Sequence, residues 1–172
     1  MRKIKVTCFR YKRHNDIYAS NVSFSTDALL SMLDVFSEQK IMILIESDDN
    51  NIRTVSSIGK SIGITEVVSN SPVPSFLAVC NKTELHYLLN QVDVNDFDGM
   101  FIANTINSVM PNELISVLAD LANSVVKDGI SDMSISINFP ENQMVISLSK
   151  ENEVMSIKDK IRGIFGDYNA TI

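Results

Sequence analysis

The stretch Lys40-Ile-Met-Ile-Leu-Ile-Glu46 decides the fold more than any other part of the sequence. Five apolar residues in a row, with a charged residue at each end, predict a short strand that is covered on both faces. Strands of this kind are typical of the middle of a sheet against which helices pack. We therefore expect an α/β or α+β fold with a mixed β-sheet and helices packed on it.

Helical spacing flanks this strand and recurs along the chain. Apolar side chains repeat every three or four residues, which predicts amphipathic helices near 26–36, 52–62, 82–91, 111–126 and 154–165. Gly63 follows the second of these helices, where a left-handed C-terminal residue is expected. Further strands are predicted near 3–9, 17–24, 64–68, 76–80 and 99–103.

The C-terminal half reads β-α-β-β-α from Gly99 onward. Its two last strands alternate apolar and polar residues between Met133 and Leu148, and Pro140 turns the chain between them, which predicts an antiparallel hairpin. This order resembles a ferredoxin-like plait that lacks its final strand. The resemblance concerns architecture and implies no function.

The length of 172 residues predicts a single globular domain over 1–172, with a possible internal junction near 69–75, where Ser, Asn and Pro cluster. The first residues alternate charged and apolar side chains, unlike a signal peptide, and the longest apolar run is five residues. We therefore expect a soluble, cytoplasmic protein without membrane contact. Cys8 and Cys80 are expected to be reduced thiols on core-facing strands.

The formal net charge is −6. Six of the fifteen basic side chains lie in the first 13 positions, which hold no acidic residue, so the rest of the chain carries nine basic and 21 acidic groups. An acidic body repels the phosphate backbone of nucleic acids, which argues against nucleic-acid binding. It favours a protein partner with a basic surface.

Three acidic residues, Glu46, Asp48 and Asp49, follow the most apolar strand. Ligand sites gather beyond the carboxyl ends of strands in open α/β sheets, so these carboxylates are candidate metal ligands. The alternative is helix capping, because Asp48 and Asp49 suit the N-terminus of the next helix.

Other short motifs are incomplete. The stretch Ser57-Ile-Gly-Lys-Ser61 ends like a phosphate-binding loop, but Thr54 stands where its first glycine is needed. The stretch 93–99 resembles a calcium loop without two of its ligands. No spacing of Cys and His indicates zinc or a nucleophile. We expect no cofactor, and catalysis is less expected than binding.

Serine-rich strands provide the candidate partner-binding surface. The residues are Ser134, Ser136 and Asn138 on one strand, with Ser147 and Ser149 on its hairpin partner. Small polar side chains leave a flat face that can hydrogen-bond to a partner or a covering loop. The alternative is an ordinary sheet face turned to solvent.

These features favour a non-catalytic, acidic protein-binding module. Its concrete version is a bacterial immunity or antitoxin-type inhibitor that masks a basic site on a toxin or nuclease. One alternative is an enzyme or sensor that binds a metal or nucleotide at Glu46–Asp49. Another is a subunit of a larger assembly, docked through the C-terminal helix. The sequence indicates no oligomeric state.

Overall fold

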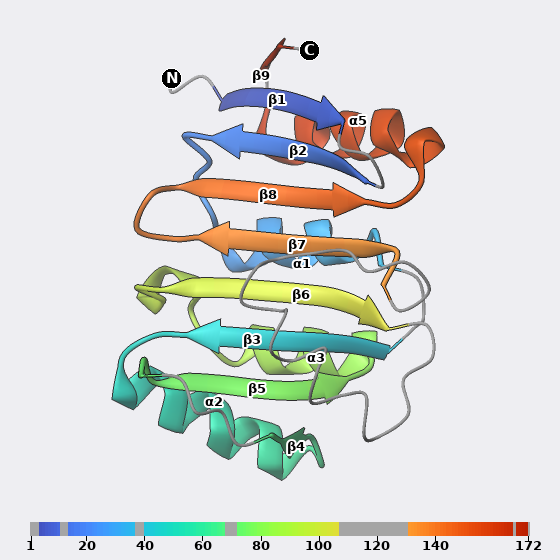
Figure 1. Cartoon of the computed structure of the whole chain (residues 1–172). Coiled ribbons are helices and arrows are strands. Elements are labelled where there is room, and N and C mark those ends of the chain that lie inside the picture. The colour runs from blue at the N-terminus through green and yellow to red at the C-terminus, as the bar shows by residue number, and fades with distance from the viewer. Residues whose placement is uncertain are drawn as a thin grey trace.

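One β-sheet runs through the whole protein (Figure 1). The computed structural model describes residues 4–10, 14–36, 40–67, 72–106, 131–166 and 168–171. Within them nine strands follow the order β4-β5-β3-β6-β7-β8-β2-β1-β9. The strands are β1 (Ile4–Arg10), β2 (Asn15–Ser20), β3 (Lys40–Glu46), β4 (Thr65–Glu66), β5 (Ser75–Cys80), β6 (Met100–Ile106), β7 (Met133–Asn138), β8 (Gln143–Leu148) and β9 (Tyr168–Thr171).

The sheet is mixed, as the sequence predicts. The eight strands from β4 to β1 are antiparallel to their neighbours, whereas β9 pairs parallel to β1 at the edge. Helices pack on this sheet, and β7, β8 and the helix after them form the expected C-terminal β-β-α arrangement. The α+β fold class is therefore confirmed.

Four described helices cover one face of the sheet, behind the strands in Figure 1. They are α1 (Thr26–Leu33), α2 (Asp49–Ser61), α3 (Lys82–Asn90) and α5 (Val154–Phe165). Contacts of α3 with both α2 and α1, and of α1 with α5, place them side by side in the order α2, α3, α1, α5. Their starts follow local chemistry: Asn81 and Glu84 form a capping box before α3. The helix expected at 111–126 lies outside the described residues.

The central strand β3 is buried on both faces, as its apolar run predicts. Ile41, Ile43 and Ile45 belong to the large core beneath the helices. Met42 and Leu44 point to the opposite face and form a second, smaller core with neighbouring strands. The sheet thus has one face covered by helices and a second face that is apolar around β3. We call the second face the helix-free face, because none of the four described helices packs on it.

The ferredoxin-like order lies elsewhere than predicted. Residues 40–106 contain the complete series β3-α2-β4-β5-α3-β6, which is the β-α-β-β-α-β order of that architecture. From Gly99 onward the resemblance fails, because β6 and β7 are antiparallel neighbours. A final strand, β9, also follows α5 and joins β1. Residue patterns indicate the type of each element but not its partners.

The possible junction near 69–75 connects two paired strands. Residues 68–71 lie outside the described part, but β4 and β5 on either side of them are antiparallel neighbours. The single-domain assignment stays a prediction, and the sheet is continuous across this point. None of the described helices is both long and apolar enough to cross a membrane.

Candidate functional site

The predicted partner-binding residues of β7 point away from the helices. Ile135 and Ile137 belong to the core beneath the helices, so Ser134, Ser136 and Asn138, which alternate with them, face the opposite side. Ile146 of β8 and Ile17 of β2 also belong to the core beneath the helices, so the residues next to them on these strands face the opposite side. The helix-free face, apolar around β3, is therefore polar across β7, β8 and β2.

A row of four buried polar side chains crosses this face. Ser134 pairs in register with Asn104 of β6 and with Ser147 of β8, and Ser147 pairs with Asp16 of β2. Each of the four is 7% exposed or less. The interpretation as an ordinary solvent-facing sheet is therefore wrong for Ser134 and Ser147, and also for Ser136, which is 5% exposed.

Three atoms of this row have no hydrogen-bond partner among the described residues: Asn104 Oδ1, Ser134 Oγ and Asp16 Oδ1. Leaving a buried polar group unpaired costs about 1–3 kcal/mol. The large majority of buried side-chain polar atoms in folded proteins are paired, so three such atoms without a hydrogen bond in one cross-strand row are unusual. This part of the sheet thus carries hydrogen-bonding groups that the described residues leave incompletely satisfied.

A pocket of about 310 Å³ opens beside the row. Its lining comes from four strands, β2, β6, β7 and β8. The lining residues are Asp16, Tyr18, Met100, Ser136, Asn138, Gln143, Val145 and Ser147. Asp16 is the one acidic side chain among these, and the Tyr18 hydroxyl donates to its Oδ2 at 3.3 Å. His14 Nε2 lies 3.5 Å from the other oxygen, Oδ1, too far for a good hydrogen bond.

The structure thus gathers most of the predicted surface. Ser136, Asn138 and Ser147 line the pocket, and Ser134 is buried in the adjoining row. Ser149 lies beyond the end of β8, where its hydroxyl donates to Asp132 Oδ1 at 3.3 Å.

Sequence reasoning missed Asp16 and Asn104. Asp16 precedes the core residue Ile17 on the same strand, so strand alternation predicts that its side chain points to the opposite face of the sheet. No sequence signal places β2 beside β8, because these strands lie at opposite ends of the chain.

The acidic end of β3 is organised by helix capping. Asp48 is the N-cap of α2, and its Oδ1 accepts from the backbone N–H groups of Asn50 at 2.8 Å and Asn51 at 2.9 Å. Glu46 ends β3 and Asp49 begins α2. No group of three or more His, Cys, Asp or Glu side chains in the described ranges could hold a metal ion. The metal hypothesis stays a prediction without support from this geometry.

A second acidic stretch lies against this strand end. The Ser47 hydroxyl donates to Asp98 Oδ1 at 2.9 Å, and Asn51 Nδ2 donates to the backbone oxygen of Asp96 at 2.7 Å. The two acidic segments that the sequence shows separately therefore form one acidic edge of the molecule. We define this acidic edge by Glu46, Asp48, Asp49, Asp93, Asp96 and Asp98.

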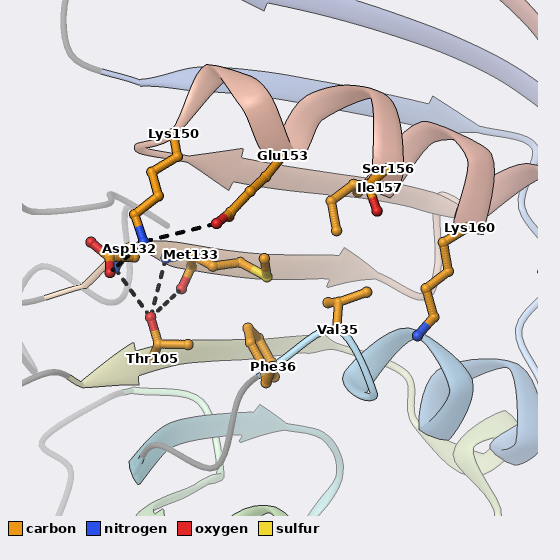
Figure 2. Close-up of a pocket in the computed structure, with 10 residues that line it drawn as sticks. All are labelled: Val35, Phe36, Thr105, Asp132, Met133, Lys150, Glu153, Ser156, Ile157 and Lys160. Carbon is orange, nitrogen blue, oxygen red and sulfur yellow. Dashed lines mark hydrogen bonds and ion pairs between the residues drawn. The ribbon is translucent and has the colours of Figure 1, made fainter.

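A larger pocket, of about 390 Å³, lies on the helix-covered side (Figure 2). It is bounded by the segment after α1, the end of β6, the start of β7, and α5 with the residues before it. Its apolar lining consists of Val35, Phe36, Met133 and Ile157. Its polar lining consists of Thr105, Asp132, Lys150, Glu153, Ser156 and Lys160. None of these residues was predicted as a site, because they come from four separate stretches of the chain.

Ion pairs cluster at one end of this pocket. Lys150 Nζ lies 3.6 Å from Asp132 Oδ2 and 3.8 Å from Glu153 Oε1. The Thr105 hydroxyl oxygen accepts from the backbone N–H groups of Asp132 and Met133, each at 3.1 Å, which positions Asp132. Lys160 lies at the other end (Figure 2).

Comparisons with known proteins show no family. No family model and no curated protein matches the chain. Among solved structures, an aspartate kinase of Clostridium acetobutylicum aligns at a TM-score of 0.25 and 14% identity, covering 74% of this chain and 32% of that protein. This likeness is too low to carry an argument about fold or function.

Proposed function

We propose that this protein is a non-catalytic binding module that holds a protein partner on the polar part of its helix-free face. The observation that carries the proposal is the row of orphaned buried atoms beside the 310 Å³ pocket. A partner cation that enters the pocket would give the buried carboxylate of Asp16 a closer partner than His14, which lies 3.5 Å away. Ser136, Asn138 and Ser147 would supply further hydrogen bonds in the pocket.

The charge of the protein favours a basic partner. Asp16 gives the pocket a carboxylate, and the net charge of the chain is −6. A lysine or arginine side chain of a partner would place its cationic group beside Asp16. None of the acidic-edge carboxylates makes an ion pair with a described residue, so this edge would attract the same partner over a longer range.

The narrower form of the proposal is an inhibitor of the bacterial immunity or antitoxin type. Such a protein covers a basic site on a toxin or nuclease. Electrostatic attraction of this kind accelerates association at low ionic strength and weakens as salt screens it. The narrower form therefore requires an association rate that falls steeply as salt rises.

The test is an affinity isolation from native cell extract at low and high salt. Four tagged proteins are compared: wild type, Asp16→Asn, Ser136→Leu and the control Asp27→Asn. Asp16→Asn keeps the shape of the side chain and removes its charge, Ser136→Leu fills the pocket, and Asp27 is exposed on α1 at the opposite face. Melting temperatures establish that each variant is folded.

We expect wild type and Asp27→Asn to retain one basic protein at low salt in equal molar amount. Asp16→Asn should retain less of it, and Ser136→Leu should lose it. Equal retention by all four folded proteins would contradict the proposed surface. Retention that high salt leaves unchanged would contradict the basic partner.

A further inference from the structure

We propose that the pocket between α1 and α5 is a separate binding site for a small linear zwitterion. Its negative end would meet Lys160, and its positive end would meet Asp132 and Glu153 (Figure 2). The site differs in chemistry and position from the proposed partner surface, because it lies on the helix-covered side. Neither proposal depends on the other.

Lys160 is the cation available at one end. Its ammonium group has no carboxylate within 4 Å among the described residues. Asp34, at the end of α1, is in electrostatic reach of Lys160 but is already engaged. Asp34 Oδ1 lies 3.1 Å from Lys82 Nζ and 3.4 Å from His86 Nε2. An anionic ligand group at this end would give Lys160 a direct partner.

The other end carries an excess of negative charge. Two carboxylates, Asp132 and Glu153, share the single ammonium group of Lys150. Both distances, 3.6 and 3.8 Å, exceed the range of a charge-assisted hydrogen bond. The Ser149 hydroxyl also donates to Asp132 Oδ1 at 3.3 Å, and both carboxylates keep further capacity to accept hydrogen bonds. A ligand ammonium group can therefore bind here without displacing Lys150.

The spacing of the two ends selects the ligand. Glu153 and Lys160 are seven residues apart along α5 and its N-cap, so they share a face and are separated by roughly 10 Å of helix rise. An α-amino acid carries both charges on one carbon and cannot reach both ends. An ω-amino acid or a short peptide can.

Apolar side chains between the ends set the character of the ligand body. Phe36, Met133 and Ile157 line the pocket and are buried from 2% to 7% exposure. Burying methylene groups against them removes apolar surface from water, which favours binding. A chain of methylenes with opposite charges at its two ends therefore fits the pocket in charge, in length and in polarity.

The experiment measures binding of ε-aminocaproate by calorimetry and by its effect on the melting temperature. Caproate, hexylamine and leucine serve as probes that lack the amine, the carboxylate or the charge separation, all at matched ionic strength. Saturating ε-aminocaproate should raise the melting temperature by about 5 °C, because it binds only the folded state. The three other probes should raise it less.

Substitutions locate the binding. Lys160→Gln and Glu153→Gln should each weaken ε-aminocaproate binding by about tenfold or more, which is the usual effect of losing a charged hydrogen bond. Asp159→Asn, on the exposed side of the same helix, is the matched control and should bind like wild type. Unchanged binding in Lys160→Gln, equal binding of caproate or hexylamine, or no response to any probe would overturn the proposal.

Discussion

Gly99 shows how a single residue holds the acidic edge together. A Cβ at this position would lie 2.4 Å from the backbone oxygen of Glu46, closer than any real contact. Because the obstacle is backbone, Gly99→Ala must displace the end of β3 or the start of β6. We expect it to lower the free energy of unfolding by roughly 1–3 kcal/mol, measured by urea denaturation.

Gly163→Ala is the matched control for that substitution. Gly163 lies in α5, and a methyl group added to it would meet no described atom within 4 Å outside the backbone of its own helix. Alanine also favours a helix more than glycine does. It should raise the free energy of unfolding by about 0.5–1 kcal/mol. If Gly99→Ala were as stable as wild type, the close approach of the two strand ends would be wrong.

Cys80 illustrates a thiol made inert by its surroundings. Both cysteines are free thiols, and Cys80 is 3% exposed on β5. Burial, with a smaller contribution from the charge of Glu84, raises the pKa of Cys80 to about 12. The folded-state pKa is thus above the unfolded value, so the neutral thiol favours folding below about pH 9, and this contribution is lost as the pH rises from 9 towards 12.

The prediction for Cys80 concerns its reactivity at pH 8. In a Cys8→Ser variant, iodoacetamide should modify the remaining thiol slowly in native buffer and rapidly in denaturant, as measured by mass spectrometry. Stability should also decline above pH 9 more steeply than in a Cys8→Ser/Cys80→Ala variant. Full modification of the native protein within minutes would show that Cys80 is exposed.

Among elements, α2 separates the two interpretations of the acidic strand end. Asp48 accepts two backbone N–H groups, so Asp48→Ala should cost about 1 kcal/mol of unfolding free energy. Asp48→Ser should retain most of that stability, because serine also caps helices. Added Mg²⁺ should leave the melting temperature of wild type unchanged. A rise with Mg²⁺ that Asp48→Ser abolishes would instead support the metal hypothesis.

Elements with strong local patterns were predicted closely. The apolar run of β3, the hairpin of β7 and β8, and the helices at 49–61, 82–90 and 154–165 agree with their spacing. The predicted end of a strand was wrong where polar residues are buried. We predicted that the strand near 99–103 ends before Asn104, but β6 continues through the buried Asn104 and Thr105. β9 was missed because its four residues are too few for their alternation to stand out as a strand pattern.

At the scale of the whole molecule, the order of strands could not be predicted. Pairing of β8 with β2 joins residues more than 120 positions apart and brings Asp16 to the serines of the hairpin. Local spacing carries no information on such pairs, because it depends only on neighbours along the chain. The serine surface could therefore be predicted from one hairpin. Its acidic residue, Asp16, and its pocket could be identified only once the order of the strands in the sheet was known.

The arrangement of the sheet divides the molecule into two faces with different expected roles. Helices cover one face, and the polar part of the other holds the proposed partner surface. Gln143 is exposed at the rim of that pocket on β8. Met155 is 64% exposed on α5, on the helix-covered side, and provides a control position.

The most direct test of this account places a photo-reactive amino acid at one of these two positions in the living cell. We predict that a residue at position 143 cross-links to the basic partner, whereas one at position 155 does not, as read by mass spectrometry. Cross-linking from position 155 alone would place the partner on the helices and contradict the proposed function of the polar sheet face.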